Sequence, residues 1–135
     1  MGSCHATMKQ KRSIENPFKS VHAAALVNFG EAVGGMAVLT AIESSTVHSF
    51  LIIKVNYKIP MQGIVVKLST EYYKKARGVL SAKCDLDFFK TGAGQSIVPE
   101  GTRDIVVPIL NSAGEEVAKV NATWKFSKSE KKKLK

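Results

Sequence analysis

Residues Val21 to Ile42 read VHAAALVNFGEAVGGMAVLTAI, and the fold that the whole sequence predicts depends on this stretch. Its apolar residues do not fall on one stripe, and a helix that is hydrophobic on nearly all sides is normally buried on nearly all sides. Gly30, Gly34 and Gly35 each lower helix propensity by about 1 kcal/mol relative to Ala, which is most easily accepted where a backbone packs closely against another element. We therefore expect a sheet wrapped around a long buried helix.

A single acid, Glu31, lies in the middle of this apolar stretch. A carboxylate taken out of water without a partner is strongly destabilised or becomes protonated, so such residues are usually kept for a function. The alternative is a helix acid that reaches solvent or pairs with a lysine of a neighbouring strand. Asn28 and Ala24 precede Glu31 by three and seven residues. This spacing places all three on one helix face.

The predicted helix begins just after Ser20, a possible N-cap, and ends near residues 43–45. The backbone N–H groups of its first turn, with the positive end of the helix dipole, would suit a developing oxyanion or a phosphate. Asn16 precedes Pro17 in the loop that leads into the helix. Because residues before proline avoid the helical region, Asn16 is either a simple turn residue or a positioned functional one.

Composition indicates one domain with a sizeable core, because 44% of the 135 residues are hydrophobic. Cys4 and Cys84 have neither CxxC nor Cys/His ligand spacing, so we expect no disulfide framework, no metal site and a reducing compartment. The polar first residues argue against a secretory signal and leave a mitochondrial presequence open. The expected location is intracellular, either cytoplasmic or mitochondrial.

The length of the apolar stretch also allows a membrane span, but Glu31 and Asn28 near its centre favour a buried helix of a soluble domain. The formal charge of +9 raises the alternative of a nucleic-acid partner. Residues 128–135 hold five lysines and one glutamate, which is typical of a basic disordered tail. Because the sequence shows no aromatic stacking platform or recognition helix, a nucleic-acid partner is not expected.

The rest of the chain predicts β-strands, with a weak edge strand before the helix and antiparallel strands after it, hence an α+β fold. The expected strands cover residues 4–14, 47–59, 64–73, 79–89, 103–110 and 116–126. Residues 90–101 are expected to form a loop without a phosphate-binding motif, and residues 111–114 a hairpin loop. The turn after residue 73 carries Lys74, Lys75 and Arg77, which form either an ordinary exposed loop or a clamp for ligand phosphates.

The run NPFKSVHAAALVNFGEAVGG places His22 six residues after Asn16 and Glu31 nine residues after His22. This pattern resembles the hotdog-fold acyl-CoA thioesterases of the PaaI-like group, and especially their DUF4442 branch, where a glutamate commonly replaces the aspartate. Residues 63–82, GIVVKLSTEYYKKARGVLSA, resemble the strand, basic turn and strand that follow the helix in that branch. The resemblance implies one hotdog domain over residues 1–127, a long central helix wrapped by a curved antiparallel sheet.

The resemblance also implies acyl-CoA hydrolysis at a site formed between protomers of a dimer or a dimer of dimers, with no cofactor beyond the coenzyme A of the substrate. The Ala23 N–H would stabilise the oxyanion of the thioester, and Glu31 would act as general base or nucleophile, its basicity raised by the apolar helix. Asn16 would position the carbonyl or the lytic water. His22 would shape the first helical turn and hydrogen-bond the thioester. The candidate substrate-binding residues are Ala24, Lys74, Lys75 and Arg77.

The sequence departs from the family pattern in three places, and the first two favour an alternative, a non-catalytic hotdog module that binds acyl-CoA or only dimerises. The common HGG is replaced by His22-Ala23-Ala24, whose methyl groups narrow the acyl or pantetheine channel. Val65 stands where some relatives carry an assisting Ser or Thr. Residues 46–61 look like an insertion that adds a strand between the helix and the usual next strand.

Overall fold

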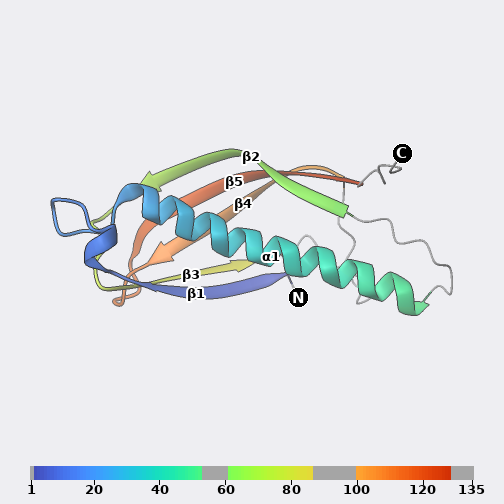
Figure 1. The fold of residues 1–135 in the computed structure, drawn as a ribbon, viewed down its shortest axis with the longest axis horizontal. Helices are drawn as coiled ribbons and strands as arrows, with labels where there is room; N and C mark the ends of the chain where they lie inside the picture. The colour runs from blue at the N-terminus through green and yellow to red at the C-terminus, as the bar shows by residue number, and fades with distance from the viewer. Residues whose placement is uncertain (1, 53–60, 87–99, 129–135) are drawn as a thin grey trace.

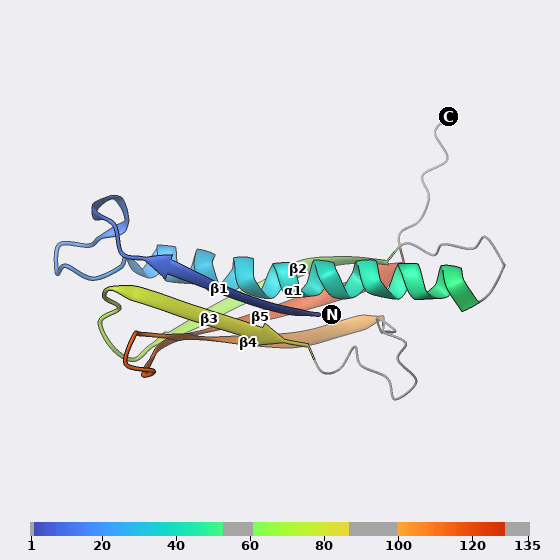
Figure 2. The same cartoon turned by 90° about the horizontal axis from the view of Figure 1, so that it is seen from below.

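One long helix lies across one face of a five-stranded antiparallel sheet (Figures 1 and 2). The computed structural model describes residues 2–52, 61–86 and 100–128, and for residues 43–52 it describes the backbone only. The elements are β1 (Ser3–Lys9), a 3-10 turn η1 (Arg12–Ile14), α1 (Ala23–Ile52), β2 (Met61–Tyr72), β3 (Val79–Asp85), β4 (Gly101–Leu110) and β5 (Glu116–Lys128). The sheet order β1-β3-β4-β5-β2 leaves β1 and β2 at its two edges.

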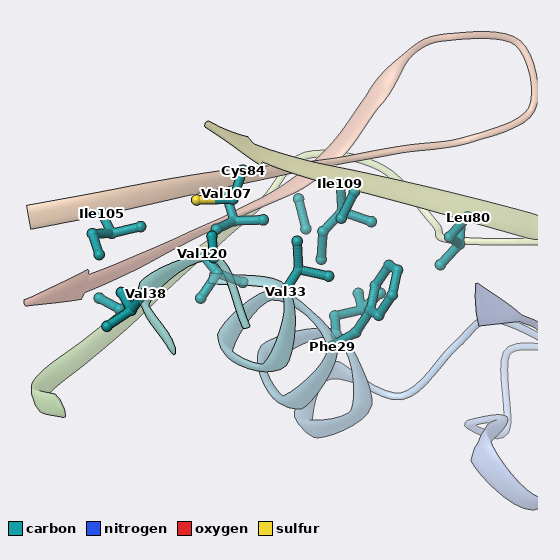
Figure 3. Packing of buried hydrophobic residues seen from close by; sticks show 14 of the residues in the cluster. Phe29, Val33, Val38, Leu80, Cys84, Ile105, Val107, Ile109 and Val120 are labelled. Carbon is teal, nitrogen blue, oxygen red and sulfur yellow. The ribbon is translucent and has the colours of Figure 1, made fainter. Parts of the chain in front are cut away.

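The core lies between α1 and the sheet, where side chains of the helix meet those of β3, β4 and β5 (Figure 3). The glycines of the helix set how close the two layers come. A Cβ atom on Gly30 would lie 2.4 Å from Val120 Cγ2, and one on Gly34 would lie 3.3 Å from Val107 Cγ2. The predicted close approach of helix and sheet is therefore confirmed at Gly30 and Gly34.

The outer face of α1 is exposed within a single chain. Met36 and Leu39 are 52% and 54% exposed, and Ala24, Asn28 and Ala32 are exposed too. The expectation of a helix buried on nearly all sides is thus wrong for one chain, because the sheet covers only one side of it. By length and composition alone the Ala23–Ile42 segment could cross a membrane, and 44% of its apolar window is buried against the rest of the chain.

Helix α1 is longer than predicted, and its start is capped differently. It continues to Ile52. A strand was predicted for residues 47–59, as the extra strand of the 46–61 insertion, and this prediction is wrong for residues 47–52, which are helical. Residues 53–60 lie outside the described residues. β-Branched and aromatic residues favour a strand only weakly, and the surrounding structure can override this preference. Continuing the helix keeps the backbone N–H and C=O groups of these residues hydrogen-bonded.

Ser20 is not the N-cap, because its hydroxyl donates to the Ala76 carbonyl at 3.1 Å. His22 takes that role, since its Nδ1 accepts the Ala24 N–H at 3.2 Å.

Most strand predictions are confirmed, with shifted ends. The first strand stops at Lys9 rather than at Ile14 and does lie at an edge. The alternating buried face of β3 is confirmed for Leu80, Ala82 and Cys84. Lys128 belongs to β5 and not to the predicted tail, because the β2–β5 ladder extends to its pairing with Met61. Residues 87–99, which include most of the predicted loop, and residues 129–135 lie outside the described residues.

Candidate active site

A groove between α1 and the edge strand β2 contains Glu31. Its volume is about 400 Å³, and its walls come from two elements. The lining residues are Ala24, Val27, Asn28 and Glu31 of α1 with Val65 and Leu68 of β2. The predicted common helix face of Ala24, Asn28 and Glu31 is therefore found on one wall of the groove. The opposite wall is apolar.

A β-bulge in β2 places both Val65 and Leu68 in this groove. Val65 pairs with Trp124 of β5 and Lys67 with Thr123, so Val66 is an extra residue in the ladder. A bulge inserts one residue and changes which side chains face which side of the sheet. Strict alternation would put Val65 and Leu68 on opposite faces, whereas the bulge turns both toward the helix. Val65 stands beside Glu31 in the groove and, as expected, offers no hydroxyl.

The Glu31 side chain is half-buried in the groove. A Cβ atom on Gly35, one turn further along the helix, would lie 3.6 Å from Glu31 Oε1 and 3.7 Å from the Trp124 ring, so both side chains lie close to Gly35. Within the described ranges, no cation or hydrogen-bond donor pairs with Glu31. The alternative of a helix acid neutralised by a lysine is therefore not seen in that part of the chain.

The first turn of α1 is held in place from three sides. The His22 N–H donates to the Ile14 carbonyl at 2.8 Å, and the Tyr72 hydroxyl donates to the Ala23 carbonyl at 3.2 Å. The Ala24 N–H is used by the His22 imidazole. The Ala23 N–H has no acceptor among the residues that the structure describes, and Ala23 is exposed. This amide is therefore available to an external oxygen at the positive end of the helix.

Asn16 organises the loop before the helix. Its Oδ1 accepts the N–H groups of Phe18 at 3.0 Å and Ser20 at 3.2 Å, and Arg77 donates to the carbonyls of Lys19 at 3.0 Å and Phe18 at 3.2 Å. The side-chain oxygen of Asn16 is thus used within the turn, and its side-chain NH₂ is the group that could contact a substrate. Asn16, His22 and Ala23 lie at the start of the helix, away from the carboxylate.

The two halves of the predicted catalytic set do not meet within one chain. Eight residues separate Ala23 from Glu31, which corresponds to about 12 Å along a helix axis. A thioester held by the Ala23 amide would therefore lie too far from the Glu31 of the same chain for direct attack. Ala24 and Glu31 line one groove. Asn16, His22 and Ala23 lie instead at the N-terminus of α1.

The three predicted phosphate-binding residues already have partners and do not converge on one point. Lys74 Nζ lies 2.6 Å from Glu115 Oε1, and this hydrogen bond, with a second one from Asn111, lowers the pKa of Glu115. Lys75 Nζ lies 5.9 Å from the centre of the Phe18 ring. Within the described ranges, Lys75 and Arg77 have an aromatic ring and carbonyls as partners and no carboxylate, so their positive charge at the loop before the helix is not neutralised there. Lys74 is directed to the β4–β5 hairpin.

Three residues of the site region were not assigned to the site by the sequence. Gly35 was noted only as a packing glycine, although it lies four residues after Glu31 and helical spacing could have placed it beside that residue. The Tyr72 hydroxyl donates to the Ala23 carbonyl at the helix start. Trp124, the one tryptophan of the chain, is buried, and its indole N–H has no acceptor in the described ranges. Among the described residues no group of three or more His, Cys, Asp or Glu could hold a metal ion.

Solved structures identify the class of fold. The chain is similar to a Streptococcus mutans protein bound to acetyl-CoA, at 15% identity over 96% of this chain and 85% of that one, with a TM-score of 0.66. A hypothetical thioesterase from Streptococcus pneumoniae with coenzyme A matches at 19% identity, 95% and 80% coverage and a TM-score of 0.64. The Escherichia coli PaaI protein of the phenylacetic acid degradation operon matches at 13% identity, 92% and 72% coverage and a TM-score of 0.63. The predicted hotdog fold, a long helix against a five-stranded antiparallel sheet, is confirmed.

Within that class, the chain belongs to the DUF4442 family, a domain of unknown function, whose family model matches residues 1–126. This confirms the branch that the Asn16, His22 and Glu31 spacing indicated. No curated protein sequence matches the chain.

Proposed function

We propose that this protein is an acyl-CoA thioesterase that hydrolyses the thioester of a fatty or aromatic acyl-CoA. The observation that carries the proposal is Glu31, a carboxylate in an apolar groove of a fold whose first helical amide is at Ala23; among the described residues neither group has a partner. Two similar structures, described above, hold acetyl-CoA or coenzyme A. The substrate carries the cofactor moiety itself, and we propose no further cofactor and an intracellular location.

In the proposed reaction, water attacks the thioester carbonyl while Glu31 accepts its proton. The negative charge that develops on the carbonyl oxygen is stabilised by the Ala23 N–H at the helix N-terminus. Collapse of the tetrahedral intermediate breaks the carbon–sulfur bond and releases the carboxylic acid and the coenzyme A thiolate. The thiolate then takes the proton from Glu31. In the alternative form, Glu31 attacks the carbonyl directly, and water then hydrolyses the resulting anhydride.

We propose that the site is assembled from two copies of the chain, because Ala23 and Glu31 of one copy are too far apart. The edge strand β2 supports this. Among the described residues only β5 pairs with this strand of twelve residues, and Ile64, Val66 and Leu68 on it are exposed. An exposed strand edge of this kind is a template for pairing with another chain. A homodimer or a dimer of dimers would cover this edge and bring Asn16, His22 and Ala23 of one copy to Glu31 of the other.

Val66→Lys is expected to convert the oligomer to a monomer and to abolish hydrolysis, because it places like charges close together across a symmetric β2 contact. The matched control is Val106→Lys on β4, since Val66 and Val106 are 50% and 47% exposed and Val106 pairs with the uncharged Asn121. Light scattering during gel filtration measures the mass of each variant. An active wild-type monomer, or a Val66→Lys oligomer of unchanged mass and activity, would contradict the proposed assembly.

The direct test of the proposed function is thiol release from short, long and aromatic acyl-CoAs by the purified oligomer. We expect release from at least one class. No release from any of them by a folded oligomer would contradict the proposal and favour the second candidate, a hotdog module that binds acyl-CoA without turnover. That candidate is motivated by Val65, which gives the groove no hydroxyl, and by the methyl group of Ala24. Binding would be followed by the fluorescence of Trp124.

Lys75 and Arg77 are proposed to bind the phosphates of coenzyme A, with Lys74 contributing less because Glu115 holds it. Lys75→Ala is expected to raise KM for acyl-CoA about fivefold at unchanged kcat, as loss of one exposed charge pair worth about 1 kcal/mol would. KM for the matching acyl-pantetheine, which lacks the nucleotide, should not change. Lys74→Ala is the comparison, with a smaller rise. An equal rise with both substrates would show a structural effect instead.

A further inference from the structure

Cys4 and Cys84, far apart in sequence, lie directly opposite each other on β1 and β3. The Leu86 N–H donates to the Gly2 carbonyl and the Gln10 N–H to the Gly78 carbonyl, both at 2.8 Å. Because hydrogen-bonded pairs alternate along an antiparallel ladder, the 4–84 pair is of the hydrogen-bonded type, with Cα atoms about 5.5 Å apart. That separation falls within the range of roughly 4.4–6.8 Å found in disulfides.

The two side chains also share one face of the sheet. Cys84 is 2% exposed and projects from β3 into the core, as Figure 3 shows, and Cys4 is half-buried and packs against the same core cluster. These are the two cysteines of the whole chain. A thiol pair at facing positions of neighbouring strands is the arrangement that a cross-strand bridge requires, and neither thiol has a part in the proposed hydrolysis.

We propose that Cys4 and Cys84 form a reversible disulfide that fastens the edge strand β1 to β3. A small disulfide such as oxidised glutathione is the oxidant. The Cys4 thiolate attacks one glutathione sulfur and expels the other glutathione as a thiolate, which leaves a mixed disulfide on Cys4. The Cys84 thiolate then attacks the Cys4 sulfur and expels the second glutathione. Two protein thiols are oxidised, and one glutathione disulfide is reduced to two thiols.

The order of these steps follows from burial. Burial, with the nearby Asp85 and Cys4, raises the pKa of the Cys84 thiol to about 11. Its thiolate is therefore scarce at neutral pH, and an external disulfide cannot reach it in the core. Cys4 is the more accessible thiol and reacts first. Cys84 then acts on a sulfur that is already held beside it.

The geometry also indicates why the bond would be reversible. Facing Cβ atoms in a ladder lie about 4.5–5.5 Å apart, whereas a disulfide needs about 3.5–4.5 Å. Strand β1 must therefore shift toward β3, which it can do because it is an edge strand with β3 as its one neighbour in the sheet of the described residues. A disulfide that holds β1 in such a shifted position is strained, and a strained disulfide is more readily reduced than a relaxed structural one.

The test is oxidation of the full chain, freed of reductant, with excess oxidised glutathione at mildly alkaline pH. We expect both thiols to disappear, the intact mass to fall by two hydrogens, and Tm to rise by roughly 5 °C or more because the bridge closes a long loop. Dithiothreitol should reverse all three changes. Cys4→Ser is the matched control, and it should show no rise in Tm on oxidation. Cys84→Ala is a second control with the same expected result. Alanine is used at this position because serine would bury a hydroxyl group in the core.

Three results would overturn the proposal. One is a glutathione adduct that persists on Cys4 while Cys84 stays reduced. Another is a bridge between two chains, seen as a dimer on a non-reducing gel. The third is a pair of thiols that remain free in the folded protein although they oxidise once it is unfolded. None of these results depends on thioesterase activity.

Discussion

Glu31→Gln is expected to lower kcat for acyl-CoA hydrolysis by about 10²- to 10⁴-fold, the range that removal of a general base or acid produces. Glutamine has the shape of glutamate, so it fills the same place beside Gly35. It can neither accept a proton from water nor form an anhydride with the acyl group. KM should change little, because the groove around residue 31 keeps its apolar walls of Val27, Val65 and Leu68.

The control for this loss is Glu100→Gln, which neutralises an exposed carboxylate whose ion-pair partner is Lys128 at 3.7 Å. It should keep the wild-type kcat. Steady-state thiol release measures both variants, and gel filtration with thermal melting shows that the Glu31→Gln oligomer is intact. If Glu31→Gln hydrolyses acyl-CoA as fast as the wild type, Glu31 is a structural residue and the proposed mechanism is wrong. A Glu31→Gln protein that no longer assembles would show instead that the carboxylate supports the interface.

The long helix was predictable because its signals are local, and its end was not. Glycines spaced along an apolar run indicated a close approach, and Gly30 beside Val120 is that contact. Residues 47–52 have the composition of a strand yet continue α1, because chain composition does not say which layer a segment will join. The N-cap was misplaced for a similar reason. Ser20 had the right chemistry, but the Ala76 carbonyl, distant in sequence, claims its hydroxyl.

The candidate site was predictable on its helical wall and not on its strand wall. Helical periodicity placed Ala24, Asn28 and Glu31 on one face, and the groove has that wall. On β2, period-two alternation predicts Val66 and Leu68 on one face and Val65 on the other. The bulge at Val66 instead places Val65 and Leu68 on the same face, toward the groove. A bulge depends on pairing with a neighbouring strand, and one strand read alone does not contain that information. The proposed contribution of a second chain would leave no signal in the local sequence either.

The contact between helix and sheet gives the second large prediction. Gly30→Ala is expected to reduce the free energy of unfolding by about 2–3 kcal/mol, because its Cβ would lie 2.4 Å from Val120 Cγ2 and 2.7 Å from Val120 Cβ. The gain in helix propensity, about 1 kcal/mol, is too small to offset an overlap with a β-branched side chain that cannot rotate away. Chemical denaturation and thermal melting both measure this loss.

Gly35→Ala is the matched control, five residues along the same helix. Its new Cβ would meet Glu31 Oε1 at 3.6 Å and the Trp124 ring at 3.7 Å, which are ordinary contacts. This variant should therefore raise the free energy of unfolding by about 0.4–1 kcal/mol, since alanine restricts the unfolded chain. If the two variants were equally stable, α1 would not lie as close to β5 as the structure places it.

Removing the opposing side chain distinguishes an overlap from a general effect of helix sequence. Val120→Ala alone should destabilise the fold, because it leaves a cavity under the helix. Combined with Gly30→Ala, it removes both methyl groups that the new Cβ would meet and leaves the contact with the residue 120 Cβ at 2.7 Å. Because the shortest contact is gone, the double variant should be more stable than the sum of the single effects by about 1 kcal/mol. Strict additivity would mean that residues 30 and 120 do not touch. A favourable coupling would establish that glycine at position 30 is required by the distance between the helix and β5.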